Sequence, residues 1–201
     1  MVDRRAAAAG PFFVLGSVDS DVVSYDYVRS PDYADFLAGG RLPEGVTTVY
    51  RGRGARARRA LASGHLFGSP ELVSARMAIL LADFADDVQL VDARVEMGSE
   101  VCEGFRSLKV LAVNDCVDLD ASEYKVTNFD PREPEYMFYR FRVRDDIEWA
   151  RDLQRAAEMR QRVVVSRRFK EACFAARLSG LTFRRVVDLT PADQGSCEVV
   201  P

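Results

Sequence analysis

The spacing of apolar residues changes near residue 88, and this change restricts the chain to folds that combine helices with a sheet. Before that point, the segment "SPELVSARMAILLADFADD" (69–87) carries apolar residues at helical spacing: Val73, Met77, Leu80, Leu81 and Phe84. This spacing predicts a helix that packs against the core and is opened by the Ser69–Pro70–Glu71 signal.

Three later segments alternate with a period of two, as strands do. They are "VQLVDARVEM" (88–97), the run from Phe105 to Ala112, and "YMFYRFRV" (136–143). In the last segment, alternation predicts one face made of Met137, Tyr139, Phe141 and Val143, and the other of Tyr136, Phe138, Arg140 and Arg142. Three successive strands predict an antiparallel sheet.

The ends of the chain carry further elements. Residues 12–28 predict two strands, with "FFVL" as a strand rather than part of a signal peptide, and 30–40 predict a short helix capped by Ser30. Residues 163–165 predict a strand, followed by Ser166 as N-cap of a helix with Phe169, Ala172, Cys173 and Ala176 inward, and then a strand carrying Leu181, Phe183 and Val186.

These elements predict an α+β fold with a mainly antiparallel sheet and a few amphipathic helices. We expect residues 1–69 to form an N-terminal region of strands and a helix, 70–190 a core domain, and 191–201 a flexible tail. The segment 145–162 is ambiguous, because its Ala, Glu, Arg and Gln content favours a helix.

The composition excludes several classes of function. Twenty-eight basic and 31 acidic side chains give a net charge of −3, so no overall field favours nucleic acid or a membrane. No apolar run approaches the ~20 residues of a membrane-spanning helix. The four cysteines lack a CxxC pairing, which indicates a reduced, cytoplasmic chain. The single histidine, His65, rules out a two-histidine metal site, and we expect it in a surface loop.

The segment "VLAVNDCVDLDASEY" (110–124) places an acidic stretch directly after a strand. Residues 114–135 hold seven acids against two bases, a local charge of −5. The acids could solvate the junction between strand and loop, or face a basic partner. They could also form a metal or catalytic site, because Asp118 and Asp120 on an extended chain would point the same way, about 6.5–7 Å apart.

Two other clusters are candidates for binding. "RGRGARARR" (51–59) holds five arginines without interleaved aromatics, which predicts a solvated or partner-facing loop rather than a nucleic-acid site. The aromatic strand 136–143 is expected to pack half of its rings in the core. Its other half, flanked by Arg140 and Arg142, has the composition of interface hot spots. Trp149 is expected to anchor packing.

Two stretches together resemble the Imm11 immunity proteins, also called the myxobacterial immunity-protein domain. "VVVSRRFKEACFAARLSGLTFRRV" is similar to the closing motif of that family, a strand ending in Val-Ser, a helix and Leu-x-Gly-Leu-x-Phe, at Val165, Ser166, Phe169, Lys170, Leu178, Gly180, Leu181 and Phe183. "LKVLAVNDCVDLDASEY" is similar to its central element, at Asn114, Asp118, Asp120, Ser122 and Tyr124. The resemblance covers about residues 70–187, which implies an Imm11-like core domain over 70–190.

The chain departs from the family pattern at one position. The family places a strand ending in Phe-Arg before Val-Ser, and "DLQR" (152–155) aligns with it, with Gln154 at the aromatic position. The resemblance therefore favours a strand over 151–155.

The resemblance implies an immunity protein that binds and neutralises a cognate toxin encoded by an adjacent gene, without catalysis, metal or cofactor. For the partner contact, the residues themselves predict Asp115, Asp118, Asp120, Glu123, Tyr124, Tyr136, Phe138 and Arg140. Two alternatives stay open. One is a metal-dependent hydrolase that uses Asp118, Asp120 and Glu123, and the other is an inhibitor or chaperone of a different co-expressed protein.

Overall fold

A computed structural model describes residues 12–18, 21–68, 70–127, 136–144, 151–185 and 197–200. Its strands are β1 Phe13–Ser17, β2 Val23–Tyr25, β3 Thr47–Gly52, β4 Leu66–Phe67, β5 Leu72–Ser74, β6 Val88–Met97, β7 Glu100–Cys102, β8 Phe105–Val110, β9 Val113–Asn114, β10 Val117–Val126, β11 Tyr136–Val143, β12 Leu153–Ala156, β13 Met159–Val165, β14 Leu181–Arg185 and β15 Cys197–Val199. Its helices are α2 Tyr33–Leu37, α3 Gly54–Ser63, α4 Ala75–Leu81 and α5 Arg167–Ala175, with the 3-10 turn η1 Ala82–Phe84.

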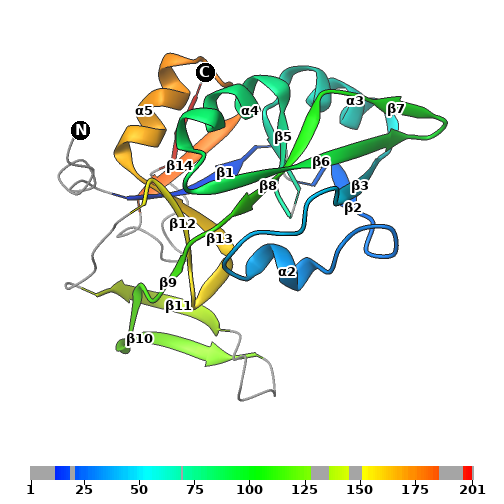
Figure 1. Ribbon diagram of the computed structural model, residues 1–201. Coiled ribbons are helices and arrows are strands. Elements are labelled where there is room, and N and C mark those ends of the chain that lie inside the picture. Colours follow the sequence, from blue (N-terminus) through cyan, green and yellow to red (C-terminus); the bar gives the residue numbers. More distant parts are fainter. Residues whose placement is uncertain are drawn as a thin grey trace.

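The described strands form two large sheets and a separate two-stranded ribbon (Figure 1). The six-stranded sheet has the order β15-β14-β1-β13-β12-β9. The seven-stranded sheet has the order β2-β3-β6-β8-β5-β4, with β7 paired to β6. The first strand, β1, therefore lies inside a sheet built mostly from the C-terminal part of the chain.

The sheets are mixed, which corrects part of the predicted fold class. Most strand pairs are antiparallel, as expected, but β3 pairs with β6 in parallel and β12 pairs with β9 in parallel. In the first case α3, β4, β5 and α4 lie between the two strands along the chain, and such crossovers are what parallel pairing requires.

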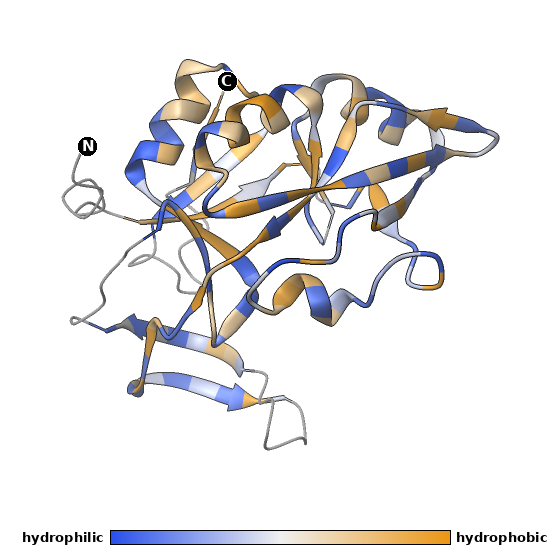
Figure 2. Ribbon diagram, viewed as in Figure 1, coloured by the Kyte–Doolittle hydropathy of each residue, from blue (hydrophilic) through white to orange (hydrophobic). Residues whose placement is uncertain are grey.

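Two apolar clusters hold the sheets and helices together (Figure 2). The first joins β1, β13 and β14 to β5, β8, α4 and α5, and includes Phe13, Met77 and Phe169. The second lies between the seven-stranded sheet and α2 and α3, and includes Phe36 and Tyr50. The seven-stranded sheet is thus covered on both faces, which explains why β8 buries the consecutive residues Ser107 to Val110.

The helix predicted over 69–87 is wrong in its first third. Residues 72–74 form β5, which pairs with β8, and α4 begins only at Ala75. Ser74 is the N-cap, because its hydroxyl accepts a hydrogen bond from the Met77 N–H. The predicted cap, Ser69, lies outside the described residues.

Three further local predictions are corrected. The N-cap of α2 is Asp32, whose carboxylate accepts from the Ala34 N–H, while Ser30 bonds to the backbone of Val49 instead. Most of the arginine run 51–59 belongs to β3 and α3 rather than to a loop. His65 is only 7% exposed, not a surface residue, and its Nδ1 lies 2.7 Å from the Ser74 Oγ.

The closing motif folds as predicted. Ser166 caps α5 by accepting from the Phe169 N–H, and Phe169 and Cys173 face the core. Residues 153–156 form the strand that the resemblance favoured, and Gln154 is fully buried. Of the other predicted residues, Trp149, Val186 and the segment 191–196 lie outside the described part of the chain.

A buried ion pair links the two large sheets. Arg155 on β12 is 0% exposed, and its Nη2 lies 2.5 Å from the Oε2 of Glu71, just before β5. The same guanidinium donates from Nη1 to the carbonyl oxygen of Arg160 at 2.7 Å. The Glu71 carbonyl in turn accepts from the Leu108 N–H on β8.

We predict that Arg155→Met destabilises the protein by about 3–5 kcal/mol, because it leaves the Glu71 carboxylate buried without a partner. The double variant Arg155→Met/Glu71→Leu should recover most of that loss. Urea unfolding measures both. As a control, Arg167→Met breaks an exposed pair with Glu171 and should change little. An Arg155→Met protein as stable as the wild type would contradict this role.

Lys109 on β8 closes the end of α2. Its side chain is 1% exposed, and its ammonium donates to the carbonyl oxygens of Asp35 at 2.6 Å and Ala38 at 2.5 Å. These carbonyls are left without partners inside the helix. Burial, with the nearby charge of Arg155, lowers the pKa of Lys109 to about 8.

This pKa shift predicts a specific dependence of stability on pH. Between pH 8 and 10.5 the unfolded chain binds more protons at Lys109 than the folded protein does, so the free energy of unfolding should rise with pH in this window. The unfolding free energy of the wild type minus that of Lys109→Met should therefore increase from pH 8 to pH 10. A difference that stays constant with pH would contradict the assigned environment.

Candidate functional site

The predicted site residues lie mostly on one projecting ribbon. We call β10 and β11 together the hairpin; it stands below the two large sheets in Figure 1. This position corrects the prediction that 136–143 extends the sheet of 88–97 and 105–112, because β11 pairs with β10 alone among the described strands. Residues 117–126, which include most of the acidic stretch predicted to lie at a junction between strand and loop, form the strand β10.

Contacts at its base attach the hairpin to the six-stranded sheet. The carboxylate of Glu158, in the turn between β12 and β13, accepts hydrogen bonds from the N–H groups of Cys116 and Val117 at 3.1 Å each. Next to it, the Asn114 side chain donates to that of Gln154. Glu158 therefore fixes where β10 starts. Sequence reasoning missed this residue, and no local pattern marks it.

A bulge divides the hairpin. Asp118 lies opposite Arg142, and Glu123 lies opposite Arg140, so four residues of β10 face a single residue of β11 between these pairs. Within the bulge the Asp118 carboxylate accepts from the Ala121 N–H, three residues further along the chain, at 3.0 Å. The chain is therefore not uniformly extended here, and the predicted spacing of Asp118 and Asp120 along a regular strand does not apply.

Three of the eight predicted residues form a ring cluster on the hairpin. Tyr124 lies opposite Phe138, and its ring contacts those of Tyr136 and Phe138, with centroids 5.1 and 5.8 Å away. Glu123 and Arg140, the next pair along the hairpin, form an ion pair, and a second shift of the register separates this pair from Tyr124 and Phe138. We call the surface formed by these three rings and the adjoining Glu123–Arg140 pair the aromatic face. Asp118 lies beyond the bulge, opposite Arg142. The remaining two, Asp115 and Asp120, are exposed, one before β10 and one in the bulge.

Two residues that were predicted to face the core are exposed instead. Met137 is 53% exposed and Tyr139 is 52% exposed. The prediction of a core face is therefore wrong for these two residues; the side chains of Phe141 and Val143, the others in that group, lie outside the described part of the structure.

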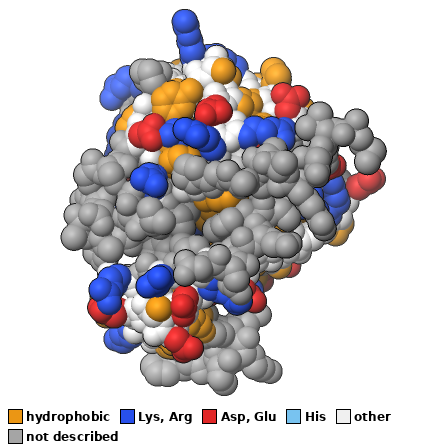
Figure 3. Space-filling view, turned by 90° about the vertical axis from the view of Figure 1, so that its left-hand side faces the viewer, with side chains coloured by type: hydrophobic (Ala, Val, Ile, Leu, Met, Phe, Trp, Pro, Cys, Tyr) orange, Lys and Arg blue, Asp and Glu red, His pale blue; other side chains and the backbone are white. Residues whose placement is uncertain are grey.

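Charges on the described part of the hairpin balance. Arg140 forms an ion pair with Glu123 at 2.9 Å, and Arg142 lies opposite Asp118. Over 115–127 and 136–144 there are four acids and four bases. The other acids of the predicted patch, Asp130, Glu133 and Glu135, lie outside the described residues. Figure 3 shows basic, acidic and apolar side chains interspersed in this lower part of the molecule.

The geometry does not gather a catalytic or metal-binding set at the bulge. Asp118 is engaged by the backbone and Glu123 by Arg140. Within the described ranges, no three His, Cys, Asp or Glu side chains lie close enough to hold one metal ion. Burial raises the pKa of the Cys116 thiol to about 12, so its thiolate is scarce at neutral pH.

No helix in the described part of the chain is long and apolar enough to cross a membrane.

Comparison with known protein families gives a match over most of the chain. No curated protein sequence matches the chain. The profile of the Immunity protein family (Imm11) matches residues 10–188, which run from just before β1 to just after β14 and include the hairpin and the closing motif. The chain belongs to the Imm11 immunity protein family.

Proposed function

We propose that this protein neutralises a cognate toxin, encoded by an adjacent gene, by binding it in a one-to-one complex through the hairpin. Membership of the Imm11 immunity protein family carries the proposal, because an immunity protein acts on a toxin. The hairpin supplies the surface. It projects from the two sheets, and its aromatic face presents tyrosine, phenylalanine and arginine together.

The composition of the aromatic face supports a protein partner. Tyrosine and arginine are enriched among the residues that dominate binding energy at protein interfaces. The ring contacts of Tyr124 hold these side chains in place before binding, which lowers the entropy lost on association. The paired charges of Glu123 and Arg140 lie beside the rings and can set orientation. Net acidity does not carry this proposal, because acids and bases balance over the described part of the hairpin.

Two tyrosines of the hairpin, Tyr124 in the ring cluster and Tyr139 with no ring contact to Tyr124, give a matched test. We predict that Tyr124→Ala weakens toxin binding about 30-fold, as loss of a hot-spot residue does, while Tyr139→Ala changes the Kd less than about threefold. Both side chains are partly exposed, at 38% and 52%. Calorimetry with the product of the adjacent gene measures both, and melting curves check that each variant is folded.

The same two variants define the results that would contradict this proposal. If Tyr139→Ala weakens binding and Tyr124→Ala does not, the contact does not use the ring cluster. If neither does, the hairpin is not the contact surface.

Stoichiometry separates binding from catalysis. Wild-type binding should be nanomolar or tighter, about −12 kcal/mol or more favourable. Titrating the protein into a fixed amount of toxin should abolish toxin activity only at one equivalent, and expression of the protein should rescue cells that make the toxin. Full protection at about one hundredth of an equivalent would show turnover and favour the hydrolase alternative.

A further inference from the structure

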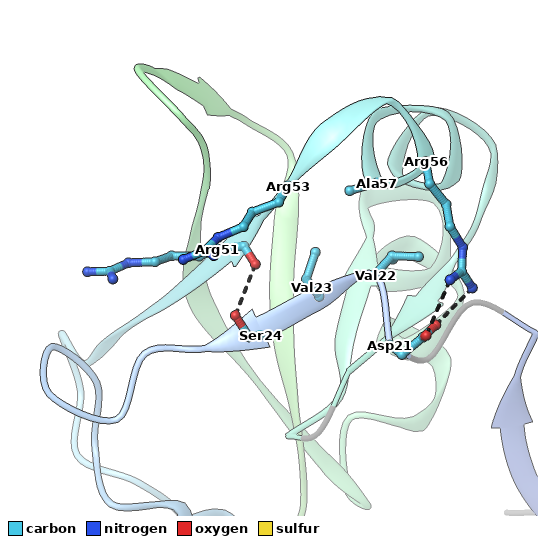
Figure 4. A pocket seen from close by; sticks show the side chains of 8 residues that line it. All are labelled: Asp21, Val22, Val23, Ser24, Arg51, Arg53, Arg56 and Ala57. Carbon is cyan, nitrogen blue, oxygen red and sulfur yellow. Dashed lines mark hydrogen bonds and ion pairs between the residues drawn. The ribbon is translucent and has the colours of Figure 1, made fainter.

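A shallow cleft of about 240 Å³ lies at the edge of the seven-stranded sheet, between β2 and the start of α3 (Figure 4). Its floor is apolar, made by Val22, Val23 and Ala57, which are 8%, 7% and 1% exposed. Its rim is basic: Arg51 and Arg53 extend to one side and Arg56 stands on the other. The two elements that border it, β2 and α3, lie at the other end of the molecule from the hairpin in Figure 1.

The rim carries more positive charge than its own acids neutralise. Arg56 is held by Asp21 through two hydrogen bonds, of 3.0 and 3.3 Å. Arg51 lies 2.8 Å from Asp26, which also pairs with Arg29 at 2.7 Å. Arg29 is bound in addition by Glu96, so two acids offset these two arginines. The guanidinium of Arg53 makes no hydrogen bond or ion pair with any part of the chain that the structure describes.

The start of α3 adds to this imbalance. A helix N-terminus favours negative charge, but the first turn of α3 holds no acid and its N-cap, Arg53, provides no side-chain acceptor. Asp21, from the turn before β2, is the acid that the cleft itself brings to this end of the helix. An additional carboxylate in the cleft would offset both the helix dipole and the guanidinium of Arg53.

The surroundings favour a protein carboxylate over nucleic acid. Acidic side chains interrupt the arginines, with Asp21 and Asp26 beside the cleft and Glu100 paired to Arg58, and these would repel a continuous phosphate backbone. No aromatic side chain lines the cleft to stack on a base. The bidentate contact of Asp21 with Arg56 shows how this rim holds a carboxylate.

We propose that this cleft is a second protein-binding site, which takes an acidic segment of a partner through Arg53, with Arg51 and Arg56 beside it. It is separate from the hairpin and does not depend on how the hairpin functions.

The test uses a fluorescein-labelled peptide of about ten residues that alternates Glu and Ser. Because the protein has a net charge of −3, binding of an acidic peptide needs a local basic site. We expect saturable binding at low salt, weakened at least about tenfold in Arg53→Glu. Arg59→Glu is the matched control, because it makes the same charge change on α3 outside the cleft, and it should bind the peptide like the wild type.

Three results would overturn the proposal. The first is no binding of the peptide to the wild type at low salt. The second is an Arg53→Glu variant that has an unchanged melting temperature and binds the peptide as well as Arg59→Glu does. The third is a single-stranded DNA oligonucleotide that binds more tightly than the peptide and loses that binding in Arg53→Glu, which would make the cleft a nucleic-acid site.

Discussion

The ion pair between Arg155 and Glu71 joins the two large sheets, and the placement of the hairpin depends on it. Arg155 lies on β12, whose backbone pairs with β9 in parallel. Two residues beyond β12, Glu158 holds the first amides of β10. The buried pair therefore fixes β12, β12 fixes β9, and the turn after β12 fixes the start of the hairpin. A buried pair of this kind contributes little net stability compared with apolar residues of the same size, but losing one partner is costly.

Local patterns predicted those elements whose neighbours in sequence are also their neighbours in space. Ser166 and the helix after it follow from capping and spacing alone, and the structure confirms both. The run 51–59 was predicted as a loop from its arginine content. The helical spacing of Ala57, Ala60 and Leu61, the buried residues of α3, was the signal for the helix that forms there. The helical spacing in 69–87 also led to a helix being predicted over β5, Leu72–Ser74. A short buried strand cannot be told from the first turn of a helix by apolar content alone.

Long-range contacts were beyond such patterns. Glu71 and Arg155 are 84 positions apart, and nothing in either segment indicates the other. For the candidate site, alternation correctly grouped Tyr136 and Phe138, whose rings are in contact. Alternation could not show that their strand pairs with the acidic segment instead of joining the sheet that contains 88–97 and 105–110. Consequently the charge count over 114–135 omitted Arg140 and Arg142, which lie opposite Glu123 and Asp118.

Hydrogen–deuterium exchange of the protein, alone and in complex with the product of the adjacent gene, shows whether the hairpin is the surface that meets the toxin. We expect slower exchange on binding over 117–126 and 136–143, with the amides of α4 and α5 unchanged. A complex that slows exchange elsewhere while leaving both hairpin strands unaffected would contradict this expectation.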